Sequence, residues 1–273
     1  MGDSDPILLR IAEALERIAP SPPSAVDWHG APAYVWDGKT AQSVADLGAL
    51  PLATLRGIDR QKEAVVANVR RLAAGHASHD MLLWGARGMG KSALVRSAVA
   101  EVQNEQPNPL TLIQLRTIDT SAIARLIAIL AEQDGAYLLY CDDLGFGSDD
   151  ATAHLALRSL LDGGIAPRPA HVRLAVTSNR RAIVARDGDG DALHERDERD
   201  NALALADRFG LTLGFHPADR EAFLDMVSAY AEPAGLEYDE EDALAWAIAR
   251  GNRSGRTAYQ YAVELAGRAG KSF

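Results

Sequence analysis

Apolar and polar residues repeat with different periods along this chain, and the changes of period divide it into three parts. Residues 7–19 place apolar side chains at helical spacing, and a proline-rich stretch at 20–24 follows them. Between about residues 55 and 216, short apolar runs alternate with helical stretches, and after Pro217 only helical spacing remains. These changes predict an N-terminal helical arm and linker (1–50), an α/β core (51–217) and a C-terminal helical lid subdomain (218–273).

Five apolar runs in the middle part predict β-strands. Helical stretches separate these runs, which is typical of parallel strands joined by helical crossovers. We therefore expect an α/β fold, with a five-stranded parallel sheet and helices on both faces. The predicted strands are 81–84, 110–115, 137–141, 172–177 and 211–215. The predicted lid helices are 219–231, 239–250 and 255–268.

Three aromatic residues, Trp28, Tyr34 and Trp36, precede the core in a segment whose pattern favours no particular element. Aromatic side chains combine a large apolar surface with a polar edge, and they commonly anchor a segment by packing. We expect these three to hold their segment against the core rather than to bind a ligand.

A glycine-rich run follows the first predicted strand. Residues 85–92 read GARGMGKS and fit the phosphate-binding pattern G-x-x-x-x-G-K-[S/T] between a strand and a helix. Glycines let backbone N–H groups turn toward phosphate oxygens, and the following helix adds its positive end. A chance glycine-rich turn is the alternative, which the strand–loop–helix context disfavours. The expected phosphate-binding residues are Gly85, Ala86, Arg87, Gly88, Met89, Gly90, Lys91, Ser92 and Ala93.

Two acids follow the third predicted strand. Asp142 and Asp143 come directly after an apolar run, and carboxyl ends of parallel strands carry the ligand site in open α/β sheets. Asp142 is placed to hold Mg²⁺ together with the Ser92 hydroxyl, while Lys91 reaches the β- and γ-phosphates. Asp143 is placed to orient or deprotonate an attacking water, and its alternative role is to cap the next helix.

Three more polar positions complete the candidate catalytic set. Asn179 ends the fourth predicted strand, where it, or Ser178 beside it, is placed to hydrogen-bond a γ-phosphate or a water; an ordinary polar turn is the alternative. Arg208 precedes the last strand, and its planar fork matches phosphate oxygens. Its alternative role is a surface salt bridge with Asp207 or another carboxylate. Arg256 opens the last helix, from which it either reaches the γ-phosphate or faces solvent.

Composition and charge bear mainly on partners and compartment. The formal net charge of −10 argues against broad capture of nucleic acid, although it leaves a local basic patch open. No apolar run approaches the roughly 20 residues that span a bilayer. Cys141 is the one cysteine, and the acidic N-terminus lacks the basic start of a secretory signal, so we expect a cytoplasmic protein. The acidic stretch 187–200 is expected to be a solvated loop rather than a calcium site.

The order of these motifs resembles that of AAA+ ATPases over residues 55–270. More narrowly, the chain is similar to the bacterial domain-of-unknown-function 815 family of predicted AAA+ ATPases. The stretches that carry this resemblance are LRGIDRQ at 55–61, LLWGARGMGKSALV at 82–95, YCDDLGF at 140–146, VTSNRR at 176–181, LADRFGL at 205–211 and GNRSGR at 251–256.

The resemblance implies a role for each matching residue. It implies that Gly57, Ile58 and Asp59 lie against adenine. It also implies that Lys91, Ser92 and Asp142 hold Mg-ATP. It further implies that Asn179 acts as sensor 1, Arg208 as an arginine finger supplied in trans within a homo-oligomer, and Arg256 as sensor 2 in the lid. One position departs from the pattern, because Asp143 stands where most active members carry the longer Glu.

The implied function is binding and hydrolysis of Mg-ATP between core and lid, coupled to conformational change. The departure at Asp143 motivates a second hypothesis, a nucleotide-gated adaptor or loader with slow hydrolysis and an unidentified protein partner. A DNA-associated motor is a third hypothesis, which the net acidity opposes. GTP is disfavoured because the sequence contains no Asn-Lys-x-Asp run, and a small-molecule kinase is disfavoured by the helical lid and the two arginines.

Overall fold

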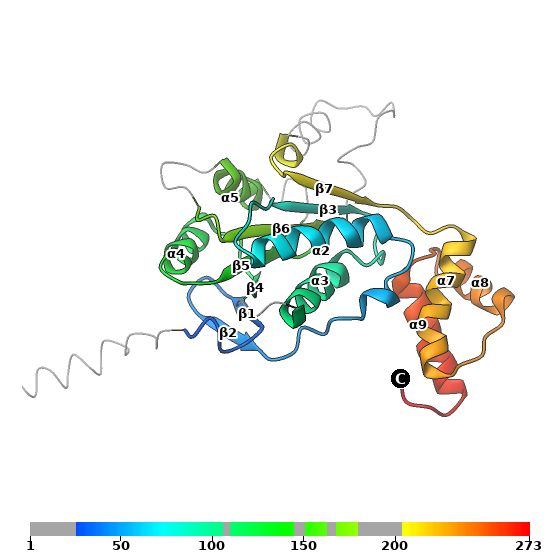
Figure 1. Ribbon diagram of the computed structural model, residues 1–273. Coiled ribbons are helices and arrows are strands. Elements are labelled where there is room, and N and C mark those ends of the chain that lie inside the picture. The colour runs from blue at the N-terminus through cyan, green and yellow to red at the C-terminus, as the bar shows by residue number, and fades with distance from the viewer. Residues whose placement is uncertain (1–25, 106–109, 145–150, 163–167, 180–203) are drawn as a thin grey trace, which may run out of the picture.

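A seven-stranded sheet forms the centre of the protein (Figure 1). The structure, a computed structural model, describes residues 26–105, 110–144, 151–162, 168–179 and 204–273. The helix predicted over 7–19 and the acidic stretch 187–200 lie outside these ranges. The strands, in spatial order, are β2 (Ala41–Val44), β1 (Ala33–Trp36), β4 (Leu110–Leu115), β5 (Ala136–Cys141), β6 (Val172–Ser178), β3 (Met81–Gly85) and β7 (Leu211–Phe215).

The prediction of five strands is wrong, because the described sheet has seven. All five predicted strands are present and mutually parallel, and β1 also pairs in parallel with β4. The additional strand β2 runs antiparallel to β1 at the edge of the sheet. Both additional strands precede residue 51, so part of the segment expected to be an arm and linker belongs to the core sheet. The division of the chain at residues 50 and 217 stays a prediction.

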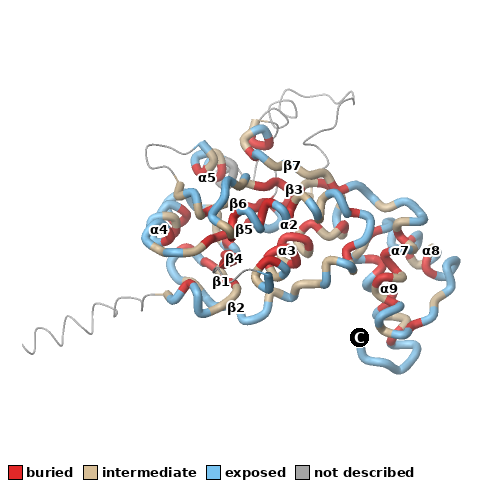
Figure 2. The backbone as a smooth tube through the Cα atoms, viewed as in Figure 1, coloured by how far each residue is buried: buried red, intermediate tan, exposed pale blue. Residues whose placement is uncertain are grey.

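Helices cover both faces of the sheet. The helices α2 (Asp59–Ala73) and α3 (Lys91–Glu105) pack on one face, and α4 (Thr120–Ala131) and α5 (Ala151–Asp162) pack on the other. Successive side chains of a strand point to opposite faces, so Met81 and Leu83 join the first apolar cluster while Leu82 joins the second. Figure 2 shows the resulting buried centre, which runs along the strands.

The three aromatic residues before the core are buried, which confirms that they anchor their segment. Trp28, Tyr34 and Trp36 retain 2%, 4% and 2% of their exposure and belong to the second apolar cluster. The Trp28 and Tyr34 rings lie 5.2 Å apart, and the Thr111 hydroxyl donates a 2.9 Å hydrogen bond to the Trp28 carbonyl. These contacts fix β1 beside β4.

The C-terminal part is helical, as predicted. It contains α7 (Arg220–Ala231), the short 3-10 helix η4 (Glu232–Ala234), α8 (Glu240–Ala249) and α9 (Gly255–Arg268). Side-chain caps from Asp219, Asp239 and Ser254 begin the three α-helices by accepting a backbone N–H in the first turn. Within the described residues, no helix is long and apolar enough to cross a membrane.

One apolar cluster joins the helical part to the core. Phe223 and Met226 of α7 are buried in the same cluster as Ile58 and Leu94. Another 3-10 helix, η1 (Leu52–Thr54), lies on the path from β2 to α2 and contacts both α3 and α7. The junction between sheet and lid is therefore packed beside the carboxyl end of β3.

Candidate functional site

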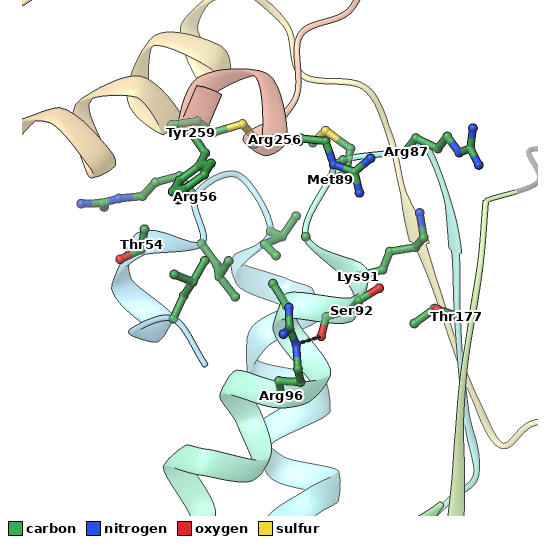
Figure 3. Close-up of a pocket in the computed structure, with 18 of the residues that line it drawn as sticks. Thr54, Arg56, Arg87, Met89, Lys91, Ser92, Arg96, Thr177, Arg256 and Tyr259 are labelled. Carbon is green, nitrogen blue, oxygen red and sulfur yellow. Dashed lines mark hydrogen bonds between the residues drawn. The ribbon is translucent and has the colours of Figure 1, made fainter. Parts of the chain in front are cut away.

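A cavity of about 540 Å³ lies at this junction, lined by the glycine-rich loop, the carboxyl ends of β5 and β6, and the lid helices α7 and α9 (Figure 3). Gly57, Gly85, Ala86 and Arg208 do not line it. Most other residues that the sequence predicts for the site do: Ile58, Arg87, Gly88, Met89, Gly90, Lys91, Ser92, Ala93, Asp142, Asp143, Asn179 and Arg256.

Two glycines of the loop occupy positions where a side chain would clash with an adjacent segment of the same protein chain. Gly85 has φ +124°, and a Cβ there would lie 2.1 Å from the Phe215 carbonyl oxygen of β7. Gly88 has φ +76°, and its Cβ would lie 2.6 Å from the Ser254 hydroxyl at the start of α9. The loop thus lies close to the backbone of β7 on one side and to side chains at the start of α9 on the other, which fits a phosphate cradle.

The Lys91 side chain is buried in the loop, with 5% of its exposure remaining. Its Nζ donates three hydrogen bonds of 2.9 Å, to the Gly85 and Ala86 carbonyls and to Asn179 Oδ1. Burial lowers the pKa of Lys91 to about 8, while the carboxylates of Asp143 and Asp142 oppose that shift. The amine is therefore held at the mouth of the loop, where phosphate oxygens would replace its present acceptors.

Three hydroxyl groups converge on the Asp142 carboxylate. Ser92, Thr177 and Tyr140 donate hydrogen bonds of 2.7, 2.7 and 2.6 Å, all to Oδ1. Burial raises the pKa of Asp142, but these hydrogen bonds outweigh it, so the pKa lies below its usual value. The carboxylate is kept ionised beside the Ser92 hydroxyl. Oxygen donors of this kind suit Mg²⁺, which commonly takes one or two carboxylates and completes its shell with phosphates and water.

Asp143 has an unusual backbone conformation. Its φ is +54°, in the left-handed region, where Asp and Asn are enriched several-fold over other non-glycine residues. Its N–H donates to Thr177 Oγ1 at 2.9 Å, and Asn179 Nδ2 donates to its Oδ1. Arg87 Nη2 lies 3.8 Å from its other carboxylate oxygen. Asn179 thus bridges Lys91 and Asp143, so the strand ends meet as predicted.

The lid contacts the loop directly through the start of α9. The Arg256 N–H donates a 3.1 Å hydrogen bond to the Gly88 carbonyl. The exposed Arg256 side chain lines the cavity beside the loop, as Figure 3 shows. The Arg256 side chain is thus both exposed and part of the cavity lining, and its role at the phosphates stays a prediction.

Arg208 lies apart from this cavity. Its Nε donates to Asp162 Oδ1 at the end of α5, and its Nη1 donates to the Ala204 carbonyl. The salt bridge with a carboxylate, which the sequence left as the alternative, is therefore present within the chain, with Asp162 rather than Asp207 as the partner.

Apolar side chains line most of the other end of the cavity, with Thr54 and Arg56 beside them (Figure 3). Leu55 and Ile58 of the core face Met226 and Tyr230 of α7 there. Gly57 does not line the cavity; its φ of +74° turns the chain at the junction, where a Cβ would lie 3.4 Å from the Met226 side chain. A planar apolar group would fit this end, and a charged chain would fit the end at Lys91.

Several residues that build the site escaped sequence reasoning. Tyr140 holds Asp142 from two residues before it, and Thr177 holds it across the β5–β6 register, which sets Cys141 beside Val176. Arg96 lines the cavity from α3, and Tyr230 and Tyr259 line it from the lid. The spacing of Arg96, four residues after Ser92 on one helical face, was the one signal available from sequence.

Comparison with protein families decides the membership of the chain. Residues 29–269 match the family model described as "Protein of unknown function (DUF815)". The chain belongs to this family. A comparison with curated protein sequences finds no match.

Solved structures share the fold at low sequence identity. The Thermotoga maritima RuvB Holliday junction branch migration motor is similar at TM-score 0.53 and 16% identity, over 82% of this chain and 68% of that one. The Aeropyrum pernix Orc1 protein, solved in complex with DNA, is similar at TM-score 0.58 and 16% identity, over 78% of this chain and 61% of that one. The likeness shows that this chain shares its α/β fold, a mostly parallel sheet covered by helices, with these two proteins.

Proposed function

We propose that this protein is an AAA+-type ATPase, which binds Mg-ATP between core and lid and hydrolyses it. The observation that carries the proposal is the meeting of Lys91, Ser92, Asp142 and Asn179 at one end of a cavity whose other end is mostly apolar. A nucleoside triphosphate has the same division into a charged chain and a planar base. The low-identity structural neighbours support the fold, and this local arrangement supports the activity.

Each residue has a defined task in this proposal. The loop N–H groups and Lys91 hold the phosphates, and Ser92 and Asp142 would hold Mg²⁺, which neutralises charge on the β- and γ-phosphates. Asp143 accepts a hydrogen bond from the attacking water and orients it toward the γ-phosphate. Asn179 fixes the Asp143 carboxylate and contacts the γ-phosphate, while Arg256 contacts it from the lid. Catalysis then rests on positioning and charge stabilisation.

We propose a homo-oligomer in which Arg208 acts on a neighbouring subunit. Arg208 does not reach the cavity of its own chain, so any contact with the phosphates must be made in trans. A second hollow, of about 590 Å³, lies between core and lid and shares Arg87 and Asn179 with the nucleotide cavity. A group from a neighbouring subunit would approach the γ-phosphate through it. A cytoplasmic location belongs to the same proposal.

The test compares nucleotide binding by the wild type and two lysine variants. Mg-ATP affinity is measured by calorimetry, with Lys91→Ala as the variant and Lys39→Ala as the control, because Lys39 lies on an exposed turn outside the cavity. We expect tight binding by the wild type and by Lys39→Ala, and loss of binding by Lys91→Ala. The proposal is overturned if the wild type does not bind Mg-ATP, or if the Lys91→Ala variant binds it with normal affinity.

The second candidate is a nucleotide-gated adaptor or loader with slow hydrolysis, and the backbone at Asp143 favours it. The short acid is held by Asn179 in a left-handed conformation that a longer Glu adopts less readily. Steady-state phosphate release separates the candidates. Strong turnover that both Asp143→Asn and Lys91→Ala abolish rejects the adaptor, whereas binding with negligible turnover supports it. DNA association, disfavoured by the net acidity, is tested by titrating labelled DNA at low salt with and without ATP.

A further inference from the structure

Arg96 is a cation at the nucleotide cavity to which neither the sequence motifs nor the proposed mechanism gives a task. It lies on α3, four residues after Ser92, and its half-buried side chain lines the cavity (Figure 3). Its Nε donates to the Ser92 carbonyl and its Nη1 to the Leu47 carbonyl, both at 3.4 Å. These bonds are longer than the usual 2.7–3.2 Å, so they hold the group weakly.

Most other cations of the cavity have a firm set of acceptors or a carboxylate nearby. Lys91 donates to three oxygen atoms at 2.9 Å, Arg87 lies 3.8 Å from Asp143, and Arg56 lies 4.0 Å from Asp225. The exposed Arg256 is the cation that the proposed function already places at the γ-phosphate. In the part of the chain that the structure describes, no carboxylate forms a salt bridge with Arg96. A guanidinium is always charged and carries five N–H donors, so a half-buried one with two weak acceptors is poised to take an anion.

The position of Arg96 indicates which part of a nucleotide it would meet. Helix side chains tilt toward the N-terminus, so the guanidinium reaches back toward the loop end of α3. In Figure 3 it lies between Thr54 on one side and Lys91 with Ser92 on the other. It therefore stands between the apolar end of the cavity and the end that would hold the β- and γ-phosphates.

We propose that Arg96 binds the α-phosphate of the nucleotide. This inference rests on the proposed nucleotide site and adds the residue that reads the phosphate next to the sugar. The planar fork of the guanidinium matches two phosphate oxygens, and binding would replace the two long hydrogen bonds to Ser92 and Leu47. The site would then favour nucleotides over nucleosides through Arg96, independently of how many phosphates follow.

The experiment measures how Arg96→Gln changes affinity along a series of ligands. Adenosine, AMP, ADP and Mg-ATP each displace a fluorescent ATP analogue from wild type, Arg96→Gln and Arg96→Lys. We expect Arg96→Gln to weaken AMP, ADP and ATP by a similar factor of about ten, while adenosine is unchanged. Arg96→Lys, which keeps a point charge without the fork, is expected to fall in between.

Arg70→Gln is the matched control, because Arg70 contacts α3 through Glu105 and lies outside the cavity. Its affinities are expected to equal those of the wild type. A loss confined to ATP, an equal loss for adenosine, or no loss at all overturns the assignment of Arg96 to the α-phosphate. A wild type that does not bind the ATP analogue contradicts the proposed function instead, so the two failures are distinguishable.

Discussion

Gly88 lies at the point where the phosphate-binding loop meets the lid, and two constraints act on it. Its φ of +76° disfavours any side chain, and a Cβ there would lie 2.6 Å from the Ser254 hydroxyl and 3.1 Å from the Arg256 Cβ. Gly75 has a similar φ of +71°, but a Cβ there would meet nothing within 4 Å. Substituting both glycines therefore distinguishes the cost of a positive φ, which both positions share, from the cost of a steric clash, which only Gly88 has.

We therefore predict different outcomes for alanine at the two positions. Gly75→Ala should lower the free energy of unfolding by about 1–2 kcal/mol, the cost of a left-handed alanine, and leave nucleotide affinity unchanged. Gly88→Ala should lower it further and weaken Mg-ATP binding, because the loop or α9 must shift. Urea denaturation and calorimetry measure both effects. If the two variants had equal stability and equal affinity for Mg-ATP, a steric clash between the added Cβ at position 88 and the start of α9 would be excluded.

Asn179 connects the loop lysine to the second acid through its amide. We predict that Asn179→Ala lowers steady-state phosphate release by about a hundredfold, the cost of removing one donor in a catalytic site, while ADP affinity stays within a few-fold. Asn104→Ala, at an exposed position of α3, is the control. Normal turnover in Asn179→Ala would remove Asn179 from the catalytic set.

Residues next to one another in the chain were the easiest to predict. The loop at 85–92 carries its whole signal in eight consecutive residues, and the cavity contains six of them. The hydroxyl groups that hold Asp142 come from two strands and a helix, and strand register cannot be obtained from one sequence. The left-handed backbone at Asp143 is also a property of the folded chain, and it is one that Asp adopts more readily than most other residues.

At the level of elements, the predicted strands and helices agreed with the structure where the sequence pattern extended over many residues. The predicted strand 110–115 and helix 255–268 match β4 and α9 at both ends. The two missed strands have only four residues each, and β2 is largely exposed, so no alternation distinguishes it. The conformation of β1 depends on its pairing with β4, about eighty residues further along the chain, and β2 in turn pairs with β1.

The pairing of β1 with β4 gives a stability prediction. Trp36 is buried at 2% exposure, so Trp36→Ala should lower the free energy of unfolding by about 3–5 kcal/mol through lost packing and the cavity left behind. Gln42→Ala on the exposed β2 should change it by less than about 0.5 kcal/mol. Urea denaturation measures both. A small effect of Trp36→Ala would mean that β1 contributes little to the core.

For the whole molecule, the proposed oligomer makes a prediction about mixtures. Arg208→Ala should bind Mg-ATP but lose hydrolysis, because no neighbour then supplies an arginine. Mixing it with Lys91→Ala should restore part of the activity, since a Lys91→Ala subunit still offers Arg208 to the intact loop beside it. Phosphate release from the separate and mixed proteins measures this.

Asp162→Asn is the control for that experiment, because it weakens the salt bridge to Arg208 without removing the arginine. It should retain hydrolysis if the arginine acts on a neighbour. Normal turnover by Arg208→Ala alone would exclude the arginine finger and leave Arg208 as a structural partner of Asp162.

The hydrogen bond from the Arg256 N–H to the Gly88 carbonyl constrains how the lid can swing. A backbone N–H cannot rotate away from its helix as a side chain can, so this hydrogen bond ties the start of α9 to the glycine-rich loop at Gly88. If α9 moves, either this hydrogen bond lengthens or Gly88 and the adjoining part of the loop move with the helix. Opening of the lid and release of phosphate by the loop would then occur together, because the lid could not open while the loop kept its phosphate-binding conformation.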